Sequence, residues 1–141
     1  DPPAHVDRLE HGLAGPIGGM CPGAAHGAVC ARLLPEIMRL NIAALRARAP
    51  ESPALARYLE VARMVTGDPH AAAEDGITWV LALVDDLRVR PLGELGLTVA
   101  DLAELLPKAQ RASSMKGNPV ALAEHELIAA LVAAGLAPPP R

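Results

Sequence analysis

Hydrophobic residues recur every three or four positions along most of this chain, which is the period of an amphipathic helix. The spacing of Leu9 and Leu13 predicts a short first helix, and we expect the glycines and proline of residues 15–19 to end it. A long apolar stretch over residues 24–47 predicts a second helix. Pro35 lies inside that stretch and should kink the helix, because proline lacks an amide donor and clashes with the preceding turn.

Several start and stop signals for helices follow in the second half of the chain. Ser52-Pro53 and Asp68-Pro69 each place a capping side chain directly before a proline, which is typical of a helix start. Gly67 should end the helix that lies between these two signals. Thr98, with Asp101 three residues later, resembles a capping box.

These patterns predict an all-α fold, a bundle of about six helices that forms a single domain over residues 1–136. Residues 137–141 are rich in proline and are expected to form an extended tail. The polar loop 113–119 precedes the last predicted helix. Its residues 116–119 could close over a ligand, but a loop that joins two helices is the simpler interpretation.

Composition and charge support this fold class and exclude several functions. One Trp, one Tyr and no Phe leave few of the aromatic side chains that strands favour. The formal net charge of -3 provides no basic surface for nucleic acid. The longest uncharged run, residues 12–31, contains too many glycines and prolines to span a membrane. Because the chain has only two cysteines and no visible export signal, we expect a cytoplasmic protein.

Residues 11–31 contain the side chains best suited to chemistry. His11 lies in the first predicted helix, and His26 lies near the start of the second. If the loop of glycine and proline between them folds back, both imidazoles could bind one divalent ion at about 2.0–2.1 Å. Spacing alone favours the competing interpretation, in which both are ordinary polar side chains.

Longer motifs add to this picture. Residues 15–20 read Gly-Pro-Ile-Gly-Gly-Met, and residues 26–31 read His-Gly-Ala-Val-Cys-Ala, followed by Leu34-Pro35 and Asn41. Glu94-Leu95-Gly96 precedes a capped helix, and the loop 113–119 precedes the last helix. In order and spacing, these motifs resemble the carboxy-terminal helical domain of iron-containing (group III) alcohol dehydrogenases, which belong to the dehydroquinate synthase-like superfamily. The resemblance covers the chain from about His11 to Gly135.

This resemblance implies a site for one divalent metal ion, Fe²⁺ or Zn²⁺, held by an Asp and three His. Two of these ligands map onto His11 and His26. The other two, and an NAD(P)-binding domain, lie earlier in the family's chain and have no counterpart in this sequence. The implied function is NAD(P)-dependent oxidation of an alcohol, or reduction of an aldehyde or ketone, by hydride transfer. We expect this chain alone to be inactive, with the nucleotide-binding domain and a small alcohol or aldehyde as partners and a homodimer as a further arrangement to consider.

Three more positions acquire roles through the resemblance. Gly15 stands where many family members carry a further His near the nicotinamide, so it is assigned to cofactor binding. Met20 and Cys21 are assigned to the wall of the substrate cleft. The loop between His11 and His26 is one residue longer than is usual in the family.

Other functions stay open on the sequence alone. The chain could be a non-catalytic interaction or regulatory domain that keeps the fold. Cys21 and Cys30 could form a structural zinc site with His11 and His26, although we expect both cysteines to be buried thiols. A lyase or oxidoreductase similar to dehydroquinate synthase or glycerol dehydrogenase would share the fold and differ in substrate. The motif at residues 15–20 favours the alcohol dehydrogenase branch.

Overall fold

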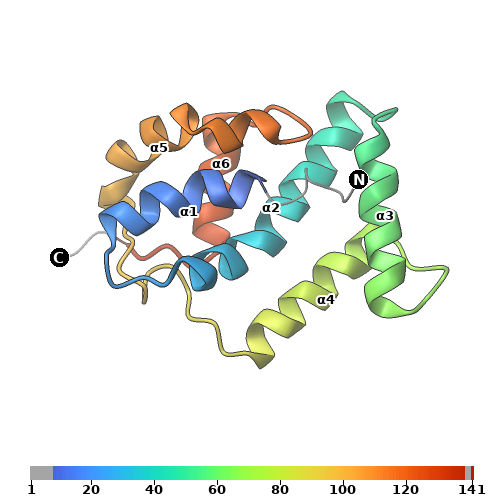
Figure 1. Cartoon of the computed structure of the whole chain (residues 1–141), viewed down its shortest axis with the longest axis horizontal. Helices are drawn as coiled ribbons and strands as arrows, with labels where there is room; N and C mark the ends of the chain where they lie inside the picture. The colour runs from blue at the N-terminus through green and yellow to red at the C-terminus, as the bar shows by residue number, and fades with distance from the viewer. Residues whose placement is uncertain (1–7, 139–140) are drawn as a thin grey trace.

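The computed structural model describes residues 8–138 and 141, without the side chains of residues 8–11, 113 and 114, and over this part the chain forms six α-helices and no strand (Figure 1). The helices are α1 (Arg8–Met20), α2 (His26–Arg48), α3 (Pro53–Thr66), α4 (Ala73–Asp86), α5 (Leu102–Arg111) and α6 (Glu124–Ala133). Two 3₁₀ helices, η1 (Val99–Asp101) and η2 (Ser113–Gly117), flank α5. The predicted all-α fold is confirmed. None of the helices in residues 8–138 is both long enough and apolar enough to cross a membrane.

The first helix continues further than its sequence predicts. We expected the glycines and proline of residues 15–19 to end it, but α1 passes through them to Met20. Leu13, Ala14 and Ile17 are completely buried, and α1 packs against α2 and α5. Burial contributes roughly 25 cal/mol per Å² of apolar surface, which offsets the low helix propensity of glycine. The predicted boundary is wrong because tertiary packing outweighs local preference in this segment.

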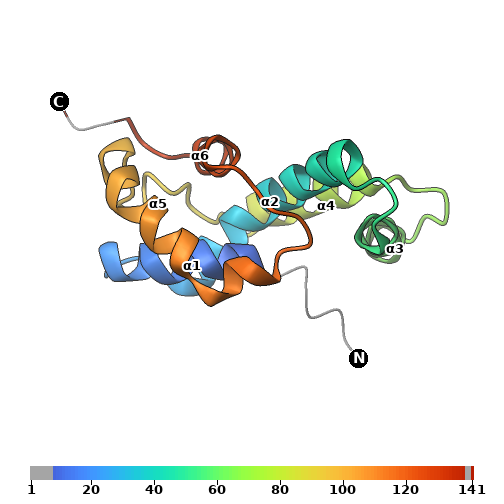
Figure 2. The ribbon, with the colours of Figure 1, turned by 90° about the horizontal axis from the view of Figure 1, so that it is seen from above.

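The second helix joins two separate hydrophobic clusters. Near its start, α2 contributes Val29, Leu33 and Ile37 to a larger cluster that also contains residues of α1, α5 and α6. Near its end it contributes Ile42 and Leu45 to a smaller cluster with α3 and α4. Figures 1 and 2 show α2 extending from the group formed by α1, α5 and α6 to the pair formed by α3 and α4. The predicted helix over residues 24–47 is confirmed, with its proline inside the helix.

Local signals set the boundaries of α3 and the start of η1, which leads directly into α5. The Ser52 hydroxyl accepts a hydrogen bond from the Ala54 backbone N–H at 3.3 Å, and Gly67 ends α3 in the left-handed conformation with a φ of 68°. The Asp101 carboxylate accepts hydrogen bonds from the backbone N–H and the hydroxyl of Thr98, at 2.7 and 3.1 Å. These signals were predicted from sequence and are confirmed.

The start of α4 differs from its prediction. Asp68-Pro69 does not begin a helix; instead the Asp68 carboxylate accepts a hydrogen bond from the His70 backbone N–H at 2.8 Å within a turn. The helix begins at Ala73, and the Asp75 carboxylate accepts from the Ala72 backbone N–H at 2.8 Å. A carboxylate in the first turn satisfies an otherwise unpaired donor and favours the later start.

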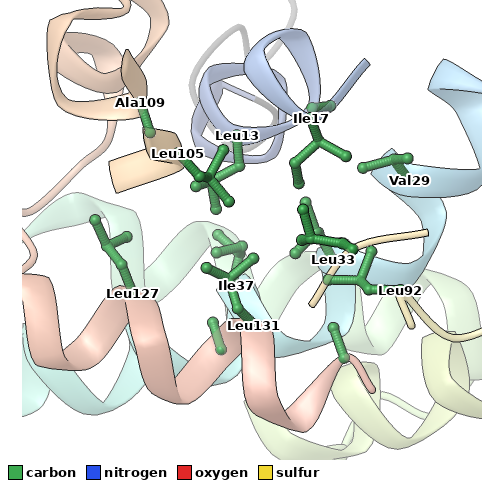
Figure 3. Packing of buried hydrophobic residues seen from close by; sticks show 14 of the residues in the cluster. Leu13, Ile17, Val29, Leu33, Ile37, Leu92, Leu105, Ala109, Leu127 and Leu131 are labelled. Atoms are coloured by element: carbon green, nitrogen blue, oxygen red, sulfur yellow. The ribbon is translucent and has the colours of Figure 1, made fainter. Parts of the chain in front are cut away.

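The segment between α4 and η1, residues 87–98, contributes side chains to the larger cluster, and Figure 3 shows one of them, Leu92, beside Leu33. Leu92 and Leu97 are completely buried. The Leu92 backbone N–H donates to the Ala134 carbonyl at 3.1 Å, which attaches this segment to the end of α6. Ala137, the first residue of the predicted tail, forms an isolated parallel bridge with Thr98, so the chain is paired at that point. Residues 139 and 140 of the tail lie outside the described residues.

A buried network of amides connects three distant segments. Asn41 is completely buried, and its Nδ2 donates to the Tyr58 hydroxyl and to Asn118 Oδ1, each at 2.9 Å. Asn118 Nδ2 donates back to Asn41 Oδ1 at 2.8 Å and to the Val120 carbonyl at 2.6 Å. Because buried polar groups are costly without partners, the network specifies how α2, α3 and the segment before α6 meet.

We predict that Asn41→Ala lowers the free energy of unfolding by about 2–3 kcal/mol, because it leaves buried groups without partners. Tyr58→Phe, which removes one hydroxyl, should cost about 1 kcal/mol. The exposed control Ala43→Ser should change stability by no more than about 0.5 kcal/mol. Urea denaturation followed by circular dichroism measures all three. Unchanged stability of Asn41→Ala would show that the network does not hold these segments.

Two glycines should respond to alanine in opposite directions. Gly135 has a φ of +90°, and a Cβ added there would overlap Pro91. Gly135→Ala should therefore destabilise the chain by about 2 kcal/mol or more. Gly18 lies inside α1, where an added Cβ meets no atom within 4 Å, so Gly18→Ala should stabilise by about 0.5–1 kcal/mol. Thermal unfolding checks this pair, and shifts of the same sign would contradict the packing described.

Candidate metal-binding site

His26 is the first residue of α2 and is exposed. A tight turn precedes it, in which the Ala24 backbone N–H donates to the Cys21 carbonyl at 2.9 Å. The Val29 backbone N–H donates to the Ala25 carbonyl at 3.1 Å and so begins the hydrogen bonds of α2. This turn joins α1 to α2, which pack against each other, and places His26 at the closed end of that helical hairpin.

Cys30 lies one turn after His26 along α2. Its Sγ is 3.5 Å from His26 Nε2, and both atoms are of types that bind metal ions. His26 and Cys30 lie on the side of α2 that buries Val29 and Leu33: His26 precedes Val29, and Cys30 lies between the two. The packing of that side fixes the rotation of α2 about its axis. It therefore also fixes the direction from which these two side chains leave the helix.

The position of the second predicted ligand is known only from its backbone. His11 belongs to α1, but its side chain lies outside the described residues. Among the side chains that are described, no group of three or more His, Cys, Asp or Glu is arranged to hold a metal ion. The convergence of His11 and His26 on one ion therefore stays a prediction.

Cys21 belongs to the hydrophobic core. It is 9% exposed and lies in the larger cluster. Burial, together with the negative charge of Asp101, raises the pKa of the Cys21 thiol. Since a metal ion binds the thiolate, a buried thiol that resists deprotonation is a poor ligand. This supports the expected buried thiol at Cys21 and disfavours a structural zinc site through it. Cys30 differs, because it is half-buried and adjoins His26.

The other assigned positions lie on different sides of α1. Gly15 is exposed, and a Cβ added to it would meet no atom within 4 Å, as is also true of Gly18 and Gly19. Met20 is partly buried and packs against the larger cluster. The cofactor role of Gly15 and the cleft roles of Met20 and Cys21 stay predictions. The bare backbone at the glycines leaves room for a ligand or a second domain to approach α1 closely.

A pocket of about 260 Å³ lies elsewhere, at the start of α3. Its lining consists of Ser52, Pro53, Ala54, Arg57, Tyr58, Gly117 and Pro119. Residues 116–119 were noted from sequence as a loop that could close over a ligand. Their proximity to α3 could not be predicted, because the two segments are far apart along the chain. Among the residues that the structure describes, this lining contains no His, Cys, Asp or Glu, so the pocket does not extend the metal-binding site.

The two thiols should differ in reactivity. We predict that iodoacetamide at neutral pH modifies Cys30 at least about tenfold faster than Cys21, because burial shields Cys21 and raises its pKa. Mass spectrometry of the digested chain gives the two rates. In denaturing urea the rates should become similar. Similar rates in the folded chain would show that Cys21 is not held in the core.

Comparison with known protein families supports the resemblance noted from sequence. The family model described as the Fe-containing alcohol dehydrogenase family, C-terminal, matches residues 4–135. No curated protein gives a match to this chain. The matched range includes all of α1 to α6 and therefore both predicted metal ligands. The chain belongs to the Fe-containing alcohol dehydrogenase family, in which it corresponds to the C-terminal domain.

Proposed function

We propose that this chain is the metal-binding half of an NAD(P)-dependent alcohol dehydrogenase and that it contributes His11 and His26 to a divalent metal ion, Fe²⁺ or Zn²⁺. The observation that carries the proposal is the family match, which extends through both helices of the hairpin that bears these residues. The remaining ligands, an Asp and a third His, would come from a nucleotide-binding half. The cytoplasm is the proposed location.

The residues present fit such an ion. His26 places an exposed imidazole at a helix start that is held by the packed hairpin, and imidazole suits both Fe²⁺ and Zn²⁺. The described side chains contain no cluster of three donors. The complete ligand set would be an Asp and three His, and such mixed ligation by His and carboxylate suits a catalytic ion that keeps a further position open to substrate. This chain would therefore supply part of a ligand set and would be inactive by itself.

The chemistry divides between the ion and the protein. When bound, the ion would act as a Lewis acid toward the oxygen of an alcohol or carbonyl substrate. The contribution of this chain would be positioning, because the buried residues of α1 and α2 anchor the hairpin from whose end His26 extends. The open backbone at Gly15 would let the nicotinamide approach α1, and the core side chains Met20 and Cys21 would support the wall of the cleft.

We predict that the purified chain binds Fe²⁺ or Zn²⁺ weakly and that His26→Ala lowers the affinity at least about tenfold, because one ligand is lost. His70→Ala and His125→Ala are the matched controls, since each removes an exposed imidazole elsewhere on the surface. Anaerobic titration calorimetry measures the affinity. If His26→Ala binds as well as the controls, His26 is not a ligand and the proposal fails; in that case, a non-catalytic helical domain becomes the better interpretation.

A further inference from the structure

The pocket at the start of α3 is a cavity that the proposed metal chemistry does not use. It has a volume of about 260 Å³ and lies where the first turns of α3 meet residues 117–119. Pockets for drug-sized ligands have volumes of about 300–1,000 Å³. This pocket therefore suits a smaller organic molecule, such as one built on a single aromatic ring or a short alkyl chain.

Much of the lining is apolar. Pro53, Ala54 and Pro119 offer aliphatic surface, and Tyr58 adds an aromatic side chain. Transfer of apolar surface from water into such surroundings is favourable. A ligand that fills the pocket therefore needs an apolar body.

Arg57 gives the pocket a positive charge. Among the lining residues that the structure describes, it alone is charged. The charged residues next to the lining along the chain, Glu51 and Lys116, have opposite charges and leave the sign to Arg57.

The Arg57 guanidinium is available to a ligand. The ion pairs that the structure shows between described residues use other cations, namely Arg32, Arg39, Arg46, Arg48 and Lys108. A guanidinium presents its N–H groups in a planar fork that matches the two oxygens of a carboxylate. The charged group that best complements this side chain is therefore a carboxylate.

Ser52 offers a second polar group in the lining. Its Oγ accepts the hydrogen bond from the Ala54 backbone N–H at 3.3 Å. A hydroxyl can accept and donate at the same time, and this bond uses Oγ only as an acceptor. The Ser52 O–H can therefore donate to an oxygen of the ligand.

The buried amide network holds both sides of the pocket. Tyr58, on the α3 side, accepts a hydrogen bond from Asn41. Asn118, which lies between the lining residues Gly117 and Pro119, bonds to Asn41 and to the Val120 carbonyl. Because the network fixes the two sides relative to each other, a ligand finds the pocket already formed and does not have to order it.

We propose that this pocket binds a small organic monocarboxylate. The apolar body of the ligand occupies the space between α3 and residues 117–119, and its carboxylate accepts hydrogen bonds from the Arg57 guanidinium and the Ser52 hydroxyl. The site is separate from the proposed metal site, because its lining contains neither His11 nor His26. Loss of either site therefore leaves the other to be tested by itself.

Titration of the full 141-residue chain with benzoate, followed by ¹H–¹⁵N correlation NMR, tests the proposal. We expect the backbone amide signals of Ala54, Arg57 and Gly117 to shift and to saturate. Benzamide has the same shape without the charge, and inorganic phosphate has charge without the apolar body. Both should bind at least about tenfold more weakly than benzoate, because each lacks one of the two interactions.

Three variants assign the interactions to residues. Arg57→Gln should weaken benzoate binding at least about tenfold, because the charge-assisted hydrogen bonds are lost. Ala54→Leu should also weaken it at least about tenfold, because it fills the pocket while keeping the guanidinium. The control Arg90→Gln removes an exposed arginine outside the lining and should leave the affinity unchanged. Circular dichroism verifies that each variant folds.

Several results would overturn the proposal. Equal affinity for benzamide and benzoate, or unchanged benzoate binding in Arg57→Gln, would show that the pocket does not recognise a carboxylate. Equal affinity for phosphate would reduce the site to a surface charge. Shifts that do not saturate, or that occur only at residues away from the lining, would show that benzoate does not bind in this pocket.

Discussion

Asn41 holds α2 against α3 and against the segment before α6 from a position with no solvent exposure. It follows Ile37, the last buried residue that α2 contributes to the larger cluster, and lies between Met38 and Ile42, which belong to the smaller cluster. Apolar packing alone is tolerant of small shifts, because hydrophobic attraction has no preferred direction. Hydrogen bonds do have one, and a buried amide that shifts loses its partners. The network therefore fixes how the two groups of helices meet along α2.

The same helix positions the candidate site at its other end. Val29 and Leu33 are completely buried, which sets the rotation of α2. On this side of the helix, the exposed His26 precedes Val29, and the partly buried Cys30 lies between Val29 and Leu33. The core thus fixes the direction in which His26 leaves the helix, while the His26 side chain itself is exposed. An imidazole that extends from a packed helix and is exposed among the described residues suits the proposed half-site, which another domain would complete.

Local signals explain which parts of this structure could be predicted from sequence. Ser52, Gly67 and the Thr98–Asp101 pair act within a few residues of themselves, and each was identified correctly. The continuation of α1 through its glycines could not be predicted, because the burial of Ile17 against other helices decides it. The Asn41–Asn118 contact joins residues 77 positions apart, and no local pattern predicts such a pair.

The candidate site likewise has one feature that the sequence shows and one that depends on contacts between distant residues. The one-turn spacing of His26 and Cys30 is visible in the sequence, whereas the burial that separates Cys21 from them depends on the tertiary fold.

The central claim is that a metal ion binds at the start of α2, and crystals of this chain grown with Zn²⁺ test it most directly. Anomalous diffraction at the zinc absorption edge locates the ion independently of any assumption about ligands. The expected result is a single strong anomalous peak within bonding distance of His26 Nε2, about 2.0–2.1 Å. Peaks only at other side chains, such as His70 or His125, would contradict the claim.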